Sequence, residues 1–385
     1  MLEYTVIMFV RISIVIFTAA LSVNAIDTSV RSQAVSQADT AAFCDRLSKA
    51  LTKHGDTIIG SGVSSLKGKS ADGMMASVFH LMFETTGNTN YRAAAVTIAE
   101  RIIAEMKATK FGVIYIKEKE KGGESISGGG PPAFGFYTAE AARIFFLEKR
   151  YDEVQYIAAV LDAFPWSEEG WWAATVDIAT GKPKEPMSKP SPINKNAAIA
   201  MAVGMISEYC KGVNAPLSAR LKSKADRCLK KIIAAQEADG FWHYSLSGND
   251  PNNKDILGYF MLTTEVLMRL REYAPSFRGL TLTDALGRAG AFAFASIAPM
   301  TDPNTNKACS RWSTRETPAH YSVSADGEKL KRTFQLGCVL IAGGYHAEGM
   351  KIIDHALKYF PYGDAGMDGA HAAYPGAFIL SILRH

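Results

Sequence analysis

Segments with the spacing of amphipathic helices follow one another along almost the whole chain. This succession constrains the fold more than any other feature of the sequence. Apolar residues recur three or four positions apart, which places them on one face of a helix. The predicted helices cover 40–53, 72–86, 91–107, 134–148, 152–164, 194–209, 217–236, 254–271, 281–297, 329–342, 346–360 and 367–383. A short β-branched stretch between breakers, 112–116, is the one predicted strand.

The connections between these helices alternate between short ones and long ones rich in aromatic residues. Helix hairpins closed into a toroid produce this pattern, with tight turns on one rim and long functional loops on the other. An open solenoid of helix pairs is the alternative, but the absence of a fixed repeat length argues against it. We therefore expect an all-α protein, an α/α toroid with minor short strands.

The composition allows one large domain or two smaller ones, with 385 residues, 48% hydrophobic and 21% charged. The formal net charge is +4 and no basic run stands out, so nucleic acid is not an expected partner. A modest positive charge is compatible with a polyanionic ligand.

The N-terminus resembles a secretory signal. Arg11 precedes the apolar run 12–21, and Val23, Asn24 and Ala25 follow with small residues at the positions a signal peptidase reads. We expect a signal peptide at 1–25, a single catalytic domain at 26–385, and a secreted or periplasmic protein with no membrane attachment after cleavage. An uncleaved anchor is the alternative.

The cysteine pattern predicts neither a disulfide framework nor a metal site. The five cysteines are odd in number and lack CxxC or CxH spacing. Cys210 and Cys228 lie on neighbouring predicted helices and form the first candidate bridge. No HExxH or EF-hand pattern occurs, so we expect no metal and no cofactor.

One segment between two predicted helices, 310–321, is dense in chemically useful side chains. It has no clean helical or strand period, so we interpret it as a loop. Cationic and aromatic groups on a loop held by helices are typical of a site for an anionic ligand. The segment contains Arg311, Trp312, Arg315, His320 and Tyr321.

Further candidates come from two other segments. His243 follows an Asp-Gly turn and titrates in the range suited to proton transfer. Asn196 lies near the start of a helix, where Asn194 could cap the helix while Asn196 faces a cleft. Four tryptophans are candidates for stacking on sugar rings, although each could equally fill core volume: Trp166, Trp171, Trp172 and Trp242. Tyr244, next to His243, is a further candidate for substrate binding.

Asn196, His243, Arg315 and Tyr321 together suit β-elimination on a uronic acid. The reaction removes a weakly acidic proton alpha to a carboxylate, which Asn and Arg donors neutralise. A base takes the C5 proton and an acid protonates the leaving O4. If the proton and O4 lie on one face of the sugar, Tyr321 serves as both. If they lie on opposite faces, His243 is the base and Tyr321 the acid.

The order of these four residues resembles polysaccharide lyase family 38, alginate and glucuronan lyase-like enzymes with an α/α toroid fold. The close Arg315–Tyr321 and wide Asn196–His243 spacings carry the resemblance. It implies an anionic polysaccharide substrate, Asn196 and Arg315 as carboxylate neutralisers, and Tyr321 as proton donor beside His243. Arg311 or His320 could replace Arg315 or His243, and both are otherwise expected to bind substrate.

Two other functions remain open from the sequence. The turn 236–242 resembles "Q…DG.W" helix ends common in α/α toroid enzymes that bind sugars, which fits more than one activity. A glycoside hydrolase could use two carboxylates, with Glu265 among several candidates. A non-catalytic glycan-binding protein is the third possibility.

Overall fold

A computed structural model describes most of the chain after the predicted signal peptide. The described residues are 35–62, 69–109, 112, 115–120, 123–128, 131–173, 176–177, 180–183, 192–244, 257–301, 308–313, 318–319, 327–363 and 367–384. The predicted signal peptide, 1–25, lies outside them. Within the described residues, no helix has both the length and the apolar character needed to cross a membrane.

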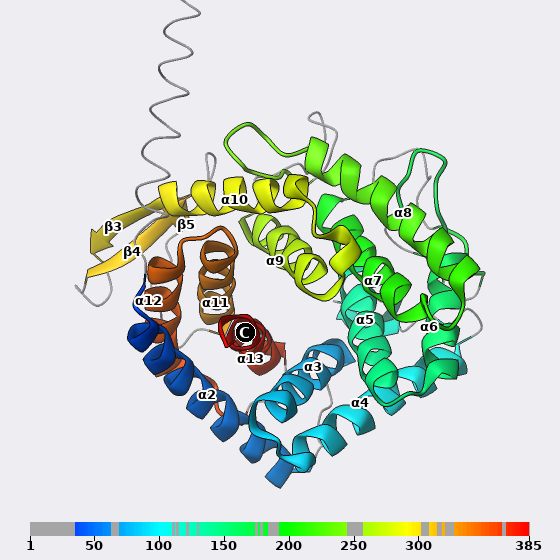
Figure 1. Cartoon of the computed structure of the whole chain (residues 1–385), viewed down its shortest axis with the longest axis horizontal. Helices are drawn as coiled ribbons and strands as arrows, with labels where there is room; N and C mark the ends of the chain where they lie inside the picture. The colour runs from blue at the N-terminus through cyan, green and yellow to red at the C-terminus, as the bar shows by residue number, and fades with distance from the viewer. Residues whose placement is uncertain are drawn as a thin grey trace, which may run out of the picture.

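Six helices of the described chain form an inner ring. They are α3 (Lys69–Thr86), α5 (Pro131–Leu147), α7 (Ile193–Cys210), α9 (Leu257–Tyr273), α11 (Gly327–Ala342) and α13 (Met367–Leu383). Each contacts the next, and α13 contacts α3, so the ring is closed (Figure 1).

Six further helices alternate with these in sequence and pack outside them. They are α2 (Gln37–Gly60), α4 (Thr89–Ala108), α6 (Tyr151–Ala163), α8 (Ala215–Ala234), α10 (Leu280–Ala295) and α12 (His346–Ala356). The predicted α/α toroid is thereby confirmed, and the solenoid alternative is excluded because the ring closes.

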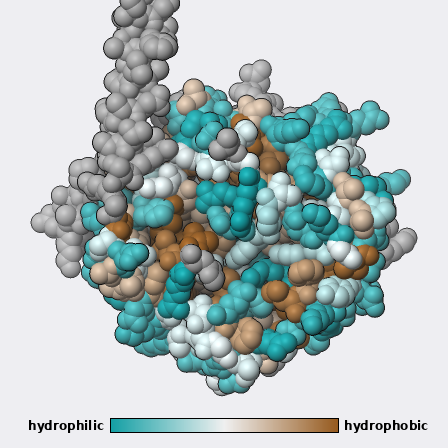
Figure 2. Space-filling model, viewed as in Figure 1, coloured by the Kyte–Doolittle hydropathy of each residue, from teal (hydrophilic) through white to brown (hydrophobic). Residues whose placement is uncertain are grey.

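The residue pattern explains which helices lie inside. The inner helix α7 buries sixteen of its eighteen residues and is rich in Ala and Met, so it has no polar face to expose. The outer helix α8 buries Leu217, Leu221, Ala225 and Cys228 at three- and four-residue spacing, which leaves its other face to solvent. In Figure 2, hydrophilic side chains accordingly cover most of the periphery, with hydrophobic ones showing further in.

Small residues allow the inner helices to approach closely. A Cβ on Gly135 of α5 would lie 2.5 Å from the Ala198 carbonyl oxygen of α7. Only glycine fits at that distance.

Connection lengths separate the two ends of the toroid. The turns from an inner helix to the next outer helix are short: the shortest is 87–88 and the longest is 274–279. The connections from an outer to the next inner helix are mostly long: 61–68, 109–130, 164–192, 235–256, 296–326 and 357–366. Since each of these precedes an inner helix, they gather at the N-terminal ends of the inner ring, which we call the long-loop end.

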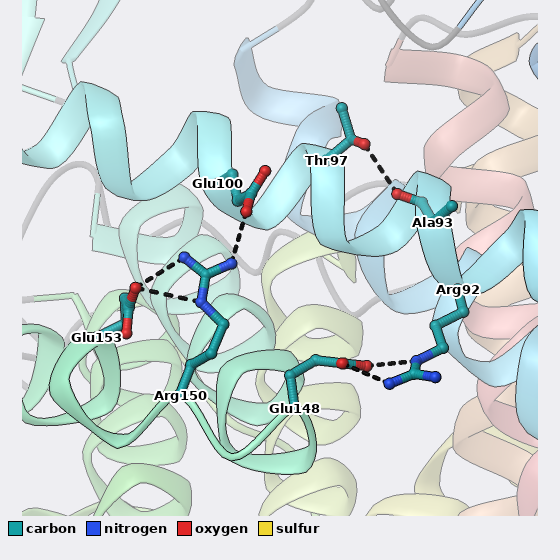
Figure 3. A network of polar contacts seen from close by, with 7 residues as sticks. All are labelled: Arg92, Ala93, Thr97, Glu100, Glu148, Arg150 and Glu153. Atoms are coloured by element: carbon teal, nitrogen blue, oxygen red, sulfur yellow. Dashed lines mark hydrogen bonds and ion pairs between the residues drawn. The ribbon is translucent and has the colours of Figure 1, made fainter.

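Ion pairs reinforce the short-turn end. Arg92 of α4 makes two hydrogen bonds to Glu148, which follows α5, and Arg150 bridges Glu100 and Glu153 at 2.6 and 2.7 Å (Figure 3). Such exposed pairs contribute about 0–1 kcal/mol each, so they fix the turn more than they stabilise the fold.

A buried polar network crosses the centre of the ring. The Arg269 guanidinium lies 3.3 Å from Glu265 and stacks 3.3 Å from the centre of the Tyr374 ring. The Tyr374 hydroxyl donates to Glu140 at 3.0 Å, and Gln335 donates to Glu265 at 3.2 Å. The network ties α5, α9, α11 and α13 together. Glu265, a candidate acid for a hydrolase, is therefore engaged in a buried ion pair.

A second ionic group lies between α3 and α5. Glu84 contacts His80 at 3.3 Å and Arg143 at 3.0 Å. Burial raises the pKa of Glu84, but the hydrogen bond from His80 and the charge of Arg143 outweigh it and lower that pKa to about 2.

The described residues form five strands, whereas the sequence analysis predicted one. The predicted strand 112–116 is replaced by an antiparallel hairpin of β1 (Tyr115–Glu120) and β2 (Gly123–Gly128). The loop interpretation of 310–321 is wrong for 310–313 and 318–319. The first belong to β4 (Ala308–Ser313), which pairs with β3 (Ile297–Thr301), and the second form β5 (Pro318–Ala319), which pairs with β4. Cross-strand hydrogen bonds hold these segments, and a short sequence window does not reveal them.

The candidate Cys210–Cys228 disulfide is not formed, since both thiols are free and buried. The Cys228 sulfur lies 3.8 Å from Asn196, at the start of α7, whereas Cys210 ends that helix. Fourteen residues of helix separate Asn196 from Cys210, about 21 Å at 1.5 Å per residue. A disulfide requires Cα atoms within about 7 Å.

Candidate functional site

The predicted site residues all belong to segments of the long-loop end. Asn196 lies in the first turn of α7, His243 lies between α8 and α9, and the segment 310–321 lies between α10 and α11. The toroid therefore brings toward one end segments that are far apart in sequence, as the functional prediction requires.

The turn that carries His243 is fixed by the residues of its own motif. The Gln236 side chain donates to the carbonyls of Gly240 and Ala285 at 2.9 and 2.8 Å, and Asp239 accepts from the Phe241 amide. Gly240 has a φ of +98°, and a Cβ there would lie 2.2 Å from the Arg288 carbonyl oxygen. Glycine is thus required, and the motif serves to build the turn.

Trp242 anchors the same turn in the core. Its indole nitrogen donates to the Ile232 carbonyl at 2.8 Å, and the side chain is 1% exposed. The following residue, His243, is half-buried and packs edge-on against Phe241 at 5.4 Å between ring centroids.

Glu237 is a partner of His243 that the sequence analysis did not identify. His243 Nε2 lies 3.1 Å from Glu237 Oε1, with the two side chains 29% and 44% exposed. A carboxylate only accepts hydrogen bonds, so this contact places a proton on Nε2 and leaves Nδ1 as the basic nitrogen of the neutral ring. Nδ1 is buried. A carboxylate six residues upstream of a histidine, across an Asp-Gly turn, was the available signal.

The His243 turn docks on the start of α7. The Ile193 amide donates to the Tyr244 carbonyl at 2.8 Å. Tyr244 is half-buried, and its ring lies 4.6 Å from that of Tyr259 on α9. The structure thus brings together two of the predicted segments, the His243 turn and the start of α7. Tyr244 and Tyr259 are half-buried aromatic residues at this contact.

Neither asparagine of α7 has the surroundings expected of it. The helix is capped at Pro192 without any side-chain hydrogen bond, so Asn194 is not a cap. Asn196 is fully buried, and its Oδ1 accepts from the Trp172 amide at 2.9 Å. Asn194 is also buried, but its Oδ1 has no hydrogen-bond partner among the described residues. The Asn196 amide therefore holds the 164–192 connection in place.

The structure corrects the prediction that three tryptophans stack on sugar rings. Trp171, Trp172 and Trp242 are at most 3% exposed, so they offer no ring face to a sugar. Trp172 packs edge-on against Trp166 at 4.4 Å, and Trp171 lies beneath the Lys231 ammonium at 5.2 Å. The large apolar area of Trp171 and Trp172 anchors the connection before α7, and that of Trp242 anchors the connection before α9.

The remaining predicted residues lie in the connection between α10 and α11. Arg311 is in β4, opposite Ala298 of β3, and its side chain is outside the described part. Arg315, His320 and Tyr321 lie outside the described residues. Their roles stay predictions.

No metal site is formed by the part of the chain that the structure describes, since no three His, Cys, Asp or Glu residues there group around one point. The expectation of a metal-independent, cofactor-free site stays a prediction.

Comparisons with known proteins concern the fold. No family model and no curated protein matches the sequence. The structure is similar to the GH76A alpha-1,6-mannanase from Salegentibacter sp. HEL1_6, with a TM-score of 0.51 and 11% identity over 88% of this chain and 99% of that chain. A weaker similarity, with a TM-score of 0.44 and 11% identity over 78% of this chain and 99% of that chain, links it to a glycoside hydrolase of family 105 from C. acetobutylicum ATCC 824.

Proposed function

We propose that the protein is a polysaccharide lyase that cleaves a uronic-acid polymer by β-elimination at the long-loop end. The observation that carries the proposal is the hydrogen bond from Ile193 to Tyr244, which joins the asparagines of α7 to the His243 turn. The similarly folded mannanase acts, by its name, on a glycan, which supports a glycan as the substrate class. The resemblance of the four-residue order to polysaccharide lyase family 38 supports a uronate.

The third segment leaves the scaffold close to the same turn. The Phe292 ring of α10 packs against Phe241 at 5.0 Å, and Phe241 contacts His243. Strand β3 begins at Ile297, five residues after Phe292. The connection that carries Arg315 and Tyr321 therefore starts near His243, which supports a shared site.

In the proposed reaction, Arg315 holds the uronate carboxylate while charge develops on it. Neither α7 asparagine is assigned a substrate contact, because Asn196 is bound to the Trp172 amide and Asn194 is 2% exposed. Tyr321 removes the C5 proton, a C4–C5 double bond forms, the C4–O4 bond breaks, and O4 receives a proton. No water is consumed.

The surroundings of His243 favour one stereochemistry. Its basic nitrogen, Nδ1, is buried while Nε2 faces Glu237, so the ring is not poised to take a proton from a sugar. We therefore assign His243 and Glu237 to positioning and Tyr321 to both proton transfers. One residue can serve both steps only where the C5 proton and O4 share a face, as in glucuronate and mannuronate polymers.

The test is to incubate the protein with glucuronan, polymannuronate, polyguluronate and pectate while following the ultraviolet absorbance of the unsaturated product. We expect product from the first two polymers, and a lower rate for Glu237→Gln than for the control Glu169→Gln, which alters an exposed carboxylate of the same end. No unsaturated product from any of the four polymers would overturn the proposal. New reducing ends without unsaturation would indicate a hydrolase, and binding without product a glycan-binding protein.

A further inference from the structure

The net charge of the outer helix α8 is more positive than the net charge of the whole chain. It has six cationic residues and one acidic residue, Asp226, for a net charge of +5. The chain has 42 cationic and 38 acidic residues, so the remainder has 36 against 37, a net charge of −1. The excess charge of the protein is therefore concentrated on one exposed helix (Figure 1).

Three of these six cations are paired with two carboxylates. Asp162 of α6 binds Arg220 at 3.0 Å and Lys224 at 2.9 Å. Asp226 binds Lys222 at 2.6 Å within α8. These three cations have a structural role in joining α8 to α6 and in stabilising the helix.

The other three, Arg227, Lys230 and Lys231, have no carboxylate partner within the described residues. Arg227 is exposed and donates to the main-chain oxygen of Glu168, Lys230 is exposed, and Lys231 lies over the Trp171 ring. Positions i, i+3 and i+4 share one face of a helix, so the three cations repel one another by a few tenths of a kcal/mol per pair. The helix dipole offsets part of this in the last turn.

These three side chains line a shallow open depression along α8, together with Ala219, Ser223 and the Lys222–Asp226 ion pair. The depression leads to the long-loop end, since α8 ends at Ala234 and the turn that carries His243 follows directly. A polyanion bound at the site can thus continue along this row of cations.

We propose that Arg227, Lys230 and Lys231 form a secondary binding surface for an anionic polysaccharide, outside the catalytic site. The identity of the polymer as a polyuronate rests on the proposed function, whereas the charge of the surface does not. The surface holds the chain by several charge contacts, which makes binding sensitive to salt.

The experiment compares the triple variant R227Q/K230Q/K231Q with the control K49Q/K211Q/K351Q, which removes the same charge from exposed lysines of α2, α12 and the turn after α7. Retardation in native gels that contain glucuronan is measured at low and high salt, with dextran as the neutral polymer. We expect roughly tenfold weaker retention of the triple variant at low salt, retention of the control close to wild type, and none in dextran. Equal retention of the two variants would overturn the proposal.

Two further measurements separate this surface from the proposed activity. If the wild type cleaves glucuronan, the triple variant should show a higher KM for polymer and unchanged turnover of short oligomers. If the wild type has no lyase activity, the gels still test the surface. The single variant Lys230→Glu alters an exposed side chain that has no ion-pair partner among the described residues, and it should weaken retention in a folded protein. Unchanged retention of that variant would also count against the surface.

Discussion

Replacing Asn196 by alanine tests its structural role in holding the Trp172 amide. Asn196 accepts a hydrogen bond from the Trp172 amide at 2.9 Å, and both residues are fully buried. Alanine leaves that N–H without an acceptor, which costs about 1–3 kcal/mol. The lost amide also leaves a small cavity, adding about 1 kcal/mol. We therefore expect the free energy of unfolding to fall by about 2–4 kcal/mol.

The expected change in melting temperature follows from the chain length. Unfolding entropies of about 2.1 cal/mol/K per residue give about 0.8 kcal/mol/K for this chain, so the Asn196→Ala variant should melt about 3–5 °C lower. Urea unfolding followed by far-UV circular dichroism measures the free energy, and a thermal scan measures the shift.

Asn194→Ala is the matched control. Its Oδ1 has no partner among the described residues, so alanine should cost less than about 1 kcal/mol in stability. The reasoning is refuted if Asn196→Ala unfolds like the wild type, or if Asn194→Ala is the more destabilised of the two.

Three other outcomes follow from the structure. Gly240→Ala should be destabilised by several kcal/mol or fail to fold, because its Cβ would lie 2.2 Å from the Arg288 carbonyl oxygen at a positive φ. Expression yield and melting temperature measure this, and a melting temperature equal to that of the wild type would contradict it. The folded-state pKa of Glu84 is about 2, below its ordinary value of 4.5, so its stabilisation is present above pH 4.5 and is lost as the pH falls toward 2. Urea midpoints across that range should fall more steeply for the wild type than for Glu84→Gln, and parallel curves would count against the pairing. Burial raises the pKa of Cys210 to about 11 and raises that of Cys228 further. Both thiols should therefore react with Ellman's reagent only after the protein unfolds. A Cys210–Cys228 disulfide detected by mass spectrometry would contradict the packing described above.

The helices and the closure of the ring were predictable because they depend on local apolar periods and connection lengths. The predicted helix 367–383 coincides with α13. The strands were harder to predict, since β4 is held by its pairing with β3, across a connection whose length the local pattern does not fix. Sequence therefore located the long-loop end but not its secondary structure.

The roles of individual side chains were less predictable because they depend on tertiary partners. Asn194 and Asn196 are equivalent by composition, and only the Trp172 amide distinguishes them. From the sequence, Trp242 could have faced either the solvent or the core. In the structure it lies in the core, where its indole nitrogen donates a hydrogen bond to the Ile232 carbonyl. Glu237 was not recognised as a partner of His243 because the Gly240 turn, not a helical spacing, brings the two together.

The most direct test of the central claim is to count the ends produced from glucuronan by the wild-type protein. Unsaturated ends are measured by ultraviolet absorbance and new reducing ends by a chemical assay on the same samples. A lyase produces one unsaturated end for each new reducing end, and we predict equal numbers throughout the reaction. New reducing ends without unsaturated ends, or no new ends at all, would contradict the proposed β-elimination.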